Sequence, residues 1–266
     1  LKHALTHGLG PSRGLALGGD VQLAEGGPLA VARAAGAASG ERFHVIDVSS
    51  DFIDAAPANV TALTVEAMQA YLAALDPDGM VSVPVSIRDF PVYAFRIMAT
   101  AREALIRAGV ERPEDHVMVY RSAWNARILI SPTPWSEADV TALETFAAAR
   151  SFDISWRPGL DVEAARAGLF NDLPVVSFES GTVVSQGTDD AIAREAEAVL
   201  QGRDSPSSRA FNIRPQTLDR PAYYASLRLD RPTTLIHRLE VLPQAEIGAL
   251  VNLVVLAQAA LIALLV

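Results

Sequence analysis

Two aspartates mark the end of one predicted strand, in the stretch FHVIDVSSDF from Phe43 to Phe52. The run from Phe43 to Val48 is mostly apolar and then breaks into two serines and an aspartate, which is typical of a buried parallel strand that ends in a polar loop. Asp47 lies within the run and Asp51 lies beyond it. Open α/β sheets bind ligands at such strand ends. A carboxylate at this position can accept a proton from a bound group or orient that group by a hydrogen bond. Each aspartate also has an interpretation without chemistry: Asp47 as a strand-end polar residue, and Asp51 as a solvated or capping loop residue.

Composition excludes several other classes of chemistry. The chain has 266 residues and a formal net charge of −9, which argues against nucleic-acid binding through phosphate neutralisation. It contains no cysteine, which excludes disulfides, thiolate metal ligands and a cysteine nucleophile. His3 and His7 have a metal-compatible helical spacing but no third ligand nearby, so we predict no metal site. No Gly-x-Ser-x-Gly motif supports a hydrolase triad.

The hydrophobic pattern predicts an alternation of strands and helices. Apolar residues recur at helical spacing between Val65 and Leu75, and the sequence DPDG from Asp76 to Gly79 predicts a turn before the next strand. The expected elements are strand 43–48, helix 64–75, strand 80–85, helix 92–108, strands 116–120 and 127–130, helix 136–150, strand 152–156 and helix 189–200. This order predicts an α/β fold: part of a doubly wound, Rossmann-like sheet that closes with an antiparallel edge hairpin.

Helix starts and loops can also be located from the sequence. Ser136 is a suitable N-cap residue, and Asp139 stands at the capping-box position three residues later. The pair Asp189–Asp190 is expected to open the helix that follows it, favoured by the helix dipole. Residues 161–208 are otherwise looser and more polar, and we predict an irregular excursion or lid there rather than a core.

The C-terminal segment from Ile247 to Val266 runs for 20 residues without a charge. As a helix it would be roughly 30 Å long, about the thickness of a bilayer core. We therefore predict a transmembrane helix, with a buried C-terminal helix as the alternative. Three arginines lie upstream, at positions 228, 231 and 238, and weakly favour a cytoplasmic N-terminal side. Because the chain begins at Leu1 rather than Met, a fragment of a longer protein is expected.

Several of these segments, in this order, resemble one protein family. ERFHVIDVSSDF, LTVEAMQAYLAALDPDGMVSV, NARILISPTPWSEADVTALETFAAARSFDISWRPG and FNIRPQTLDRPAYY, followed by a hydrophobic helix, are similar to segments of the spermidine synthase-like proteins. These are relatives of the S-adenosylmethionine-dependent methyltransferases, and the likeness is greatest to a bacterial integral-membrane subgroup. The resemblance extends from about Val21 to Val266. It implies a methyltransferase-like Rossmann domain that binds S-adenosylmethionine or its decarboxylated form and transfers an aminopropyl or methyl group to a small-molecule amine.

The same resemblance implies roles for individual residues. Glu25 and Gly26, in VQLAEGG, fall where the family's acid–glycine pair lies near the adenine. Ser49 falls where the catalytic aspartate is expected, so Asp51, one residue ahead of the place of a second acid, is the better catalytic candidate and Asp47 the weaker one. The family's glycine-rich cofactor loop is not evident: LGGD at 17–20 lies too close to Phe43, and we expect the first half of the domain to be missing.

Asp219, in LDRP, is expected either to pair with Arg220 and pin the loop against the sheet or to contact the substrate. The sequence thus predicts residues 1–160 as the later part of a Rossmann-like domain, 161–246 as an excursion and linker, and 247–266 as a transmembrane helix. The predicted function is a transferase of the spermidine synthase-like kind, or a descendant that has lost the reaction, at the bacterial inner membrane with its soluble domain in the cytoplasm. The alternative is a non-catalytic nucleotide- or polyamine-binding regulatory domain.

Overall fold

A computed structural model gives the arrangement of the chain. It describes residues 29–33, 42–48, 61–87, 91–176, 182–221, 223, 225, 226, 228, 230 and 244–265. The structural statements below concern these residues.

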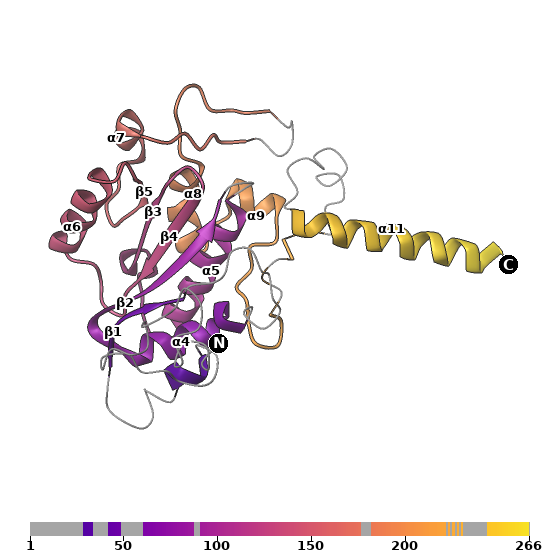
Figure 1. The fold of residues 1–266 in the computed structure, drawn as a ribbon, viewed down its shortest axis with the longest axis horizontal. Helices are drawn as coiled ribbons and strands as arrows, with labels where there is room; N and C mark the ends of the chain where they lie inside the picture. Colours follow the sequence, from indigo (N-terminus) through magenta and orange to yellow (C-terminus); the bar gives the residue numbers. More distant parts are fainter. Residues whose placement is uncertain are drawn as a thin grey trace, which may run out of the picture.

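The centre of the molecule is a five-stranded mixed sheet with the strand order β1-β2-β4-β3-β5 (Figure 1). The strands are β1 (Phe43–Asp47), β2 (Leu75–Ser86), β3 (Val117–Arg121), β4 (Asn125–Ile130) and β5 (Asp153–Trp156). β1 pairs with β2 in parallel, whereas β4 runs antiparallel to both β2 and β3. The α/β fold and the antiparallel hairpin are confirmed. The hairpin does not form the edge, however, because β5 pairs with the outer side of β3.

The turn expected from Asp76 to Gly79 lies inside β2, where it forms a bulge. Phe43 pairs with Leu75, and Val45 pairs with Met80. A step of two residues along β1 therefore corresponds to a step of five residues along β2. A Cβ atom at Gly79 would lie 2.7 Å from the Phe43 carbonyl oxygen. Glycine at this position therefore lets the bulge pack closely against β1.

Three helices cover one face of the sheet and enclose the main core. They are α4 (Val65–Ala74), α5 (Val92–Arg107) and α8 (Ala191–Leu200). Alternate β2 residues point into this core, because successive strand side chains face opposite sides of a sheet; they are Val81, Val83 and Val85. Buried side chains of α8 contribute to the same core. The segment expected to be an excursion therefore contains a core helix.

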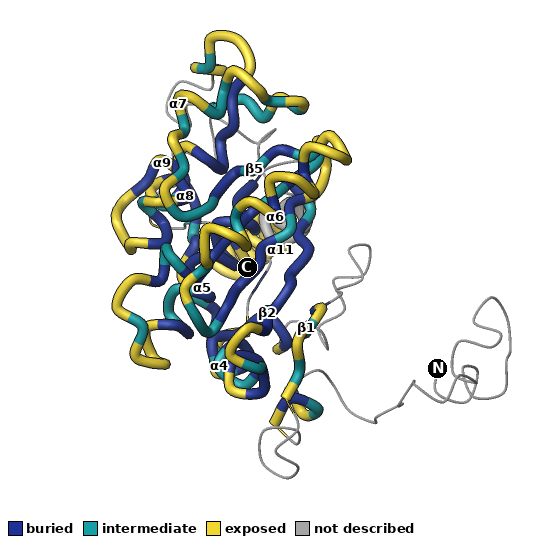
Figure 2. The backbone as a smooth tube through the Cα atoms, turned by 90° about the vertical axis from the view of Figure 1, so that its left-hand side faces the viewer, coloured by how far each residue is buried: buried dark blue, intermediate teal, exposed yellow. Residues whose placement is uncertain are grey.

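The second face carries a smaller core, built by Met118 of β3, Leu129 of β4 and Leu143 of α6 (Glu137–Ala148). The capping box predicted for α6 is confirmed, since the Ser136 side chain accepts from the Asp139 amide and the Asp139 side chain accepts from the Ser136 amide. Figure 2 shows the contrast between the buried inner strands and β1 at the edge of the sheet. The remaining short helices are η2 (Thr61–Leu63), η3 (Pro113–His116), α7 (Val162–Ala165), η4 (Arg166–Gly168) and α9 (Pro206–Ala210).

The C-terminal helix α11 (Gln244–Leu265) projects away from the sheet (Figure 1). In the part of the chain that the structure describes, no helix has both the length and the apolar character needed to cross a membrane. The predicted transmembrane helix at 247–266 is not supported, and the predicted location at the bacterial inner membrane is wrong.

Candidate functional site

The carboxyl ends of three strands meet at one edge of the sheet. β1 is parallel to β2, and β3 has the same direction because both β2 and β3 are antiparallel to β4. Strand-end side chains are therefore gathered along this carboxyl edge, which is where open α/β sheets bind ligands. The exposed indole of Trp124, in the turn between β3 and β4, lies at the same edge.

Asp47, the last residue of β1, is held in an ion pair at this edge. Its two carboxylate oxygens each lie 3.1 Å from Arg127 Nη1, and the same nitrogen donates to Ser82 Oγ at 2.6 Å. The three side chains belong to β1, β2 and β4, so the contact crosses the full width of β2. Both charged side chains stay partly exposed, at 46% for Asp47 and 34% for Arg127. The guanidinium therefore already supplies a counter-charge to the Asp47 carboxylate, which reduces its attraction for a cationic amine.

Four other residues singled out in the sequence lie outside the described residues. They are Glu25, Gly26, Ser49 and Asp51. Their expected roles near the adenine and the reacting amine stay predictions. The described residues of the carboxyl edge supply a paired carboxylate, a hydroxyl and an aromatic face, which do not make a cofactor site by themselves.

Asp219 lies on the surface, and its contact with Arg220 does not attach the loop to the sheet. Its side chain is 77% exposed, and Arg220 Nε is 3.9 Å away. A hydrogen bond from Thr217 Oγ1 at 2.5 Å is the first cause that keeps the pKa of the Asp219 carboxyl below its usual value. The loop is instead attached to the helices by the Leu218 amide, which donates to Glu66 Oε2 at 2.9 Å.

A buried arginine with two aspartates forms a site that the sequence did not reveal. The Arg121 side chain, at the end of β3, has no exposed surface. Its Nε donates to Asp190 Oδ2 at 2.7 Å and its Nη2 donates to the Asn171 carbonyl at 2.8 Å, while Nη1 lies 3.5 Å from Asp153 Oδ2. Burial of a cation is unfavourable unless anionic partners compensate its charge, and Asp153 and Asp190 do so for Arg121.

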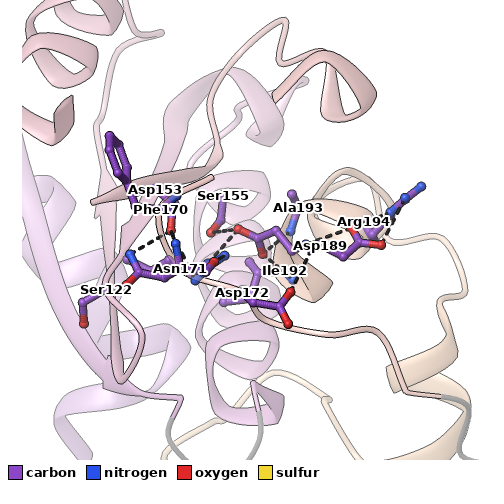
Figure 3. Close-up of polar contacts among 12 residues, drawn as sticks. Ser122, Asp153, Ser155, Phe170, Asn171, Asp172, Asp189, Ile192, Ala193 and Arg194 are labelled. Atoms are coloured by element: carbon purple, nitrogen blue, oxygen red, sulfur yellow. Dashed lines mark hydrogen bonds and ion pairs between the residues drawn. The ribbon is translucent and has the colours of Figure 1, made fainter. Parts of the chain in front are cut away.

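The partners of this arginine are themselves saturated with hydrogen bonds (Figure 3). Asp153 accepts from the amides of Phe170 and Asn171 at 2.7 and 2.9 Å. Asp190 accepts from Ser155 Oγ at 2.8 Å and also caps α8, as the sequence predicted, by accepting from the amides at positions 192 and 193. Because its acceptors are occupied, this Arg121 cluster has a structural role: it ties Phe170 and Asn171 to β3, β5 and the start of α8.

Asp189, the neighbour of this cluster, is buried just before the start of α8 and paired with arginines. It accepts from Arg194 Nε at 3.1 Å and Arg194 Nη2 at 3.2 Å, and Arg166 Nε lies 3.5 Å away. Burial opposes its charge, but the bonds from Arg194 and from the Asp190 amide outweigh burial and hold the pKa of Asp189 below its usual value.

Comparison with known proteins does not assign the chain to a family. No model of a known protein family matches the sequence, and no curated protein matches it. Functional arguments therefore depend on the residues and on the fold.

Proposed function

We propose that the chain belongs to a Rossmann-like, spermidine synthase-like transferase that binds S-adenosylmethionine or its decarboxylated form at the carboxyl edge of β1 and β2. The observation that supports this proposal is the order of the sheet. Two parallel strands joined by helix α4 are followed by helix α5 and an antiparallel pair, β3 and β4. This is the order expected for the later half of such a domain, and it brings the end of β1 to the carboxyl edge, where such sheets bind ligands.

The proposed reaction moves an aminopropyl or methyl group from a sulfonium to an amine. The new C–N bond forms as the C–S bond breaks, the electron pair of that bond stays on sulfur as a thioether, and the amine loses one proton to a base. Asp51 is the proposed base. A carboxylate beside the amine would also favour binding of a cationic substrate.

A second function, a non-catalytic domain that binds a nucleotide or a polyamine, is supported by one specific contact. Asp47 is the described carboxylate at the end of β1, and it is already paired with Arg127. Because Arg127 already pairs with Asp47, this carboxylate is poorly placed to take a proton from an amine. The edge suits a binding and regulatory role at least as well as catalysis.

Calorimetry and a transfer assay separate the two functions. We expect the chain to bind S-adenosylmethionine or its decarboxylated form, and to form a new C–N product when putrescine is added. Asp51→Asn should leave cofactor binding within about three-fold and reduce transfer by about 100-fold or more, as removal of a general base does. Asp54→Asn, in the same stretch of sequence, is the matched control and should keep transfer near the wild-type rate.

Each outcome decides between the proposals. Binding of a cofactor or of putrescine without any transfer would favour the regulatory domain. An absence of heat with both cofactor forms and with putrescine would reject the transferase and a polyamine-binding domain, and equal losses in Asp51→Asn and Asp54→Asn would reject Asp51 as the base.

A further inference from the structure

A second candidate site lies on the helical side of the molecule, away from the carboxyl edge. A half-open cavity of about 770 Å³ lies between α5, the C-terminal end of α8, residues of the stretch 202–215, and Arg228 and Asp230. Small-molecule pockets typically have volumes of about 300–1,000 Å³. The helices contribute Ala99, Arg102 and Val199, which lie in their later turns. Because α5 and α8 begin near the carboxyl ends of β2 and β3, the cavity is displaced toward the opposite edge of the sheet.

The cavity is positively charged, although the chain is acidic. Four arginines and two aspartates line it, at positions 102, 203, 214 and 228 and at positions 204 and 230, which gives a local charge of +2 against −9 for the whole chain. Arg203 is paired with Glu197 at 3.3 Å, and Arg228 with Asp230 at 2.7 Å. The other two arginines have no side-chain hydrogen bond or ion pair within the described part of the chain; they are Arg102 and Arg214.

The position of Arg102 is fixed by the backbone next to it. A Cβ atom at residue 202 would lie 2.4 Å from Arg102 Nη2 and 2.5 Å from its Cζ, so the glycine there leaves room for the guanidinium. Gly202 has a φ of +71°, which also favours glycine. Arg102 Nε is buried without a hydrogen-bond partner. Arg102 lines the cavity and has no counter-charge among the described residues, and a bound anion would supply one.

The walls of the cavity favour a small ligand with an anionic group and an apolar body. The largely buried residues Phe211 and Ile213 line the cavity and supply its apolar part. Asn212 also lines the cavity and supplies an amide. Guanidinium groups match phosphate oxygens in a planar, bidentate geometry. A nucleic acid is disfavoured because its binding depends on an extended basic surface, whereas the positive charge here is confined to one cavity.

We propose that this arginine-lined cavity binds a phosphorylated small molecule, with Arg102 and Arg214 holding the phosphate and Phe211 and Ile213 contacting the apolar part. The site is independent of the function proposed for the carboxyl edge. S-adenosylmethionine carries no phosphate, so the two sites select different ligands.

Calorimetry of the whole chain with AMP, pyrophosphate and adenosine tests this proposal. We expect AMP and pyrophosphate to bind, and adenosine to bind at least ten-fold more weakly than AMP. Arg102→Met and Arg214→Met should each weaken AMP binding about ten-fold or more, which is the loss expected when a hydrogen bond to a charged group is removed. Arg107→Met is the matched control, because Arg107 lies on the same helix and pairs with Glu66 and Glu103 outside the cavity.

A melting curve for each variant shows that it is folded, and Arg107→Met should bind AMP within two-fold of wild type. Saturating S-adenosylmethionine should leave AMP binding unchanged. The proposal is overturned by an absence of binding for AMP and pyrophosphate at 5 mM, by wild-type affinity in folded Arg102→Met and Arg214→Met, or by an equal loss in Arg107→Met. Competition by S-adenosylmethionine would also overturn it, since AMP would then occupy the carboxyl edge.

Discussion

Arg121 shows how strongly one buried charge can hold distant parts of the chain together. Its guanidinium contacts Asp153 and Asp190, 32 and 69 positions later in sequence, and all three side chains are almost fully buried. Replacing it with methionine would leave two carboxylates in the interior without their cation. We expect Arg121→Met to lower the free energy of unfolding by about 3–5 kcal/mol, measured by urea denaturation.

Arg150→Met is the control for this measurement. Arg150 lies on the surface after α6, with its guanidinium 4.1 Å from the Phe146 ring centre, and its loss should cost less than about 1 kcal/mol. Adding Asp190→Asn to Arg121→Met should recover part of the stability, because asparagine removes one orphaned charge and still caps a helix. A loss below 1 kcal/mol in Arg121→Met would mean that the buried cluster does not form.

At the residue scale, the sequence predicts what is local and misses what is brought together by folding. The start of α8 at Asp190 could be predicted because an aspartate before a helical run is a local signal. Arg121 could not, since VMVYR carries no sign of its partners. The sequence left two interpretations open for Asp47, and its contact with Arg127, 80 positions later, could not be inferred from spacing.

At the element scale, the start of α8 predicts a pH dependence. Asp189 has a pKa below its usual value in the folded protein, because Arg194 and Arg166 face it, although Asp172 and Glu163 are also close. A lowered folded-state pKa stabilises the fold above the pKa of the unfolded state, about 3.9, and this contribution is lost as the pH falls through the folded-state pKa.

We therefore expect Asp189→Asn to lower the free energy of unfolding by about 2 kcal/mol at neutral pH, the value of hydrogen bonds to a charged group. In urea denaturation the difference from wild type should be constant between pH 7 and pH 5 and shrink below about pH 4. Asp161→Asn, which retains the cap of the four-residue helix α7, is a control of the same chemistry. A difference that persists unchanged at pH 3 would contradict the assignment of the effect to the charge.

The types of the main helices and strands followed from hydrophobic periodicity, but their packing partners did not. Helix α5 was expected at 92–108 and runs from Val92 to Arg107. The DPDG segment lies within β2 because β1 pairs with β2 both before and after the bulge that this segment forms. Likewise, the polar surroundings of α8 suggested an excursion, whereas its apolar face completes the main core between α5 and β5. Burial of one helix face depends on which neighbours the whole chain supplies.

At the scale of the whole molecule, α5 connects the sheet to the C-terminal part of the chain. The buried Arg96 side chain donates to the carbonyl oxygens of Asn212, Tyr223 and Ala225, and Thr100 Oγ1 accepts from the Gln216 amide at 3.2 Å. These contacts hold the segment that forms one wall of the arginine-lined cavity. The cavity therefore depends on a connection between parts of the chain more than 100 positions apart.

Loss of this connection should release the segment while the sheet stays folded. We expect Arg96→Met to increase amide hydrogen exchange at positions 211–226 by at least ten-fold, because three backbone carbonyls lose a charged donor, and to leave exchange in β2 and β4 much less affected. Thr145→Val, on the outer side of α6, removes a hydroxyl bond within its own helix and should leave both regions unchanged. If the cavity wall depends on Arg96, AMP binding should weaken in the same variant. Uniformly faster exchange across β2, β4 and 211–226 would instead mean that α5 supports one cooperative unit, and that the C-terminal segment cannot open separately.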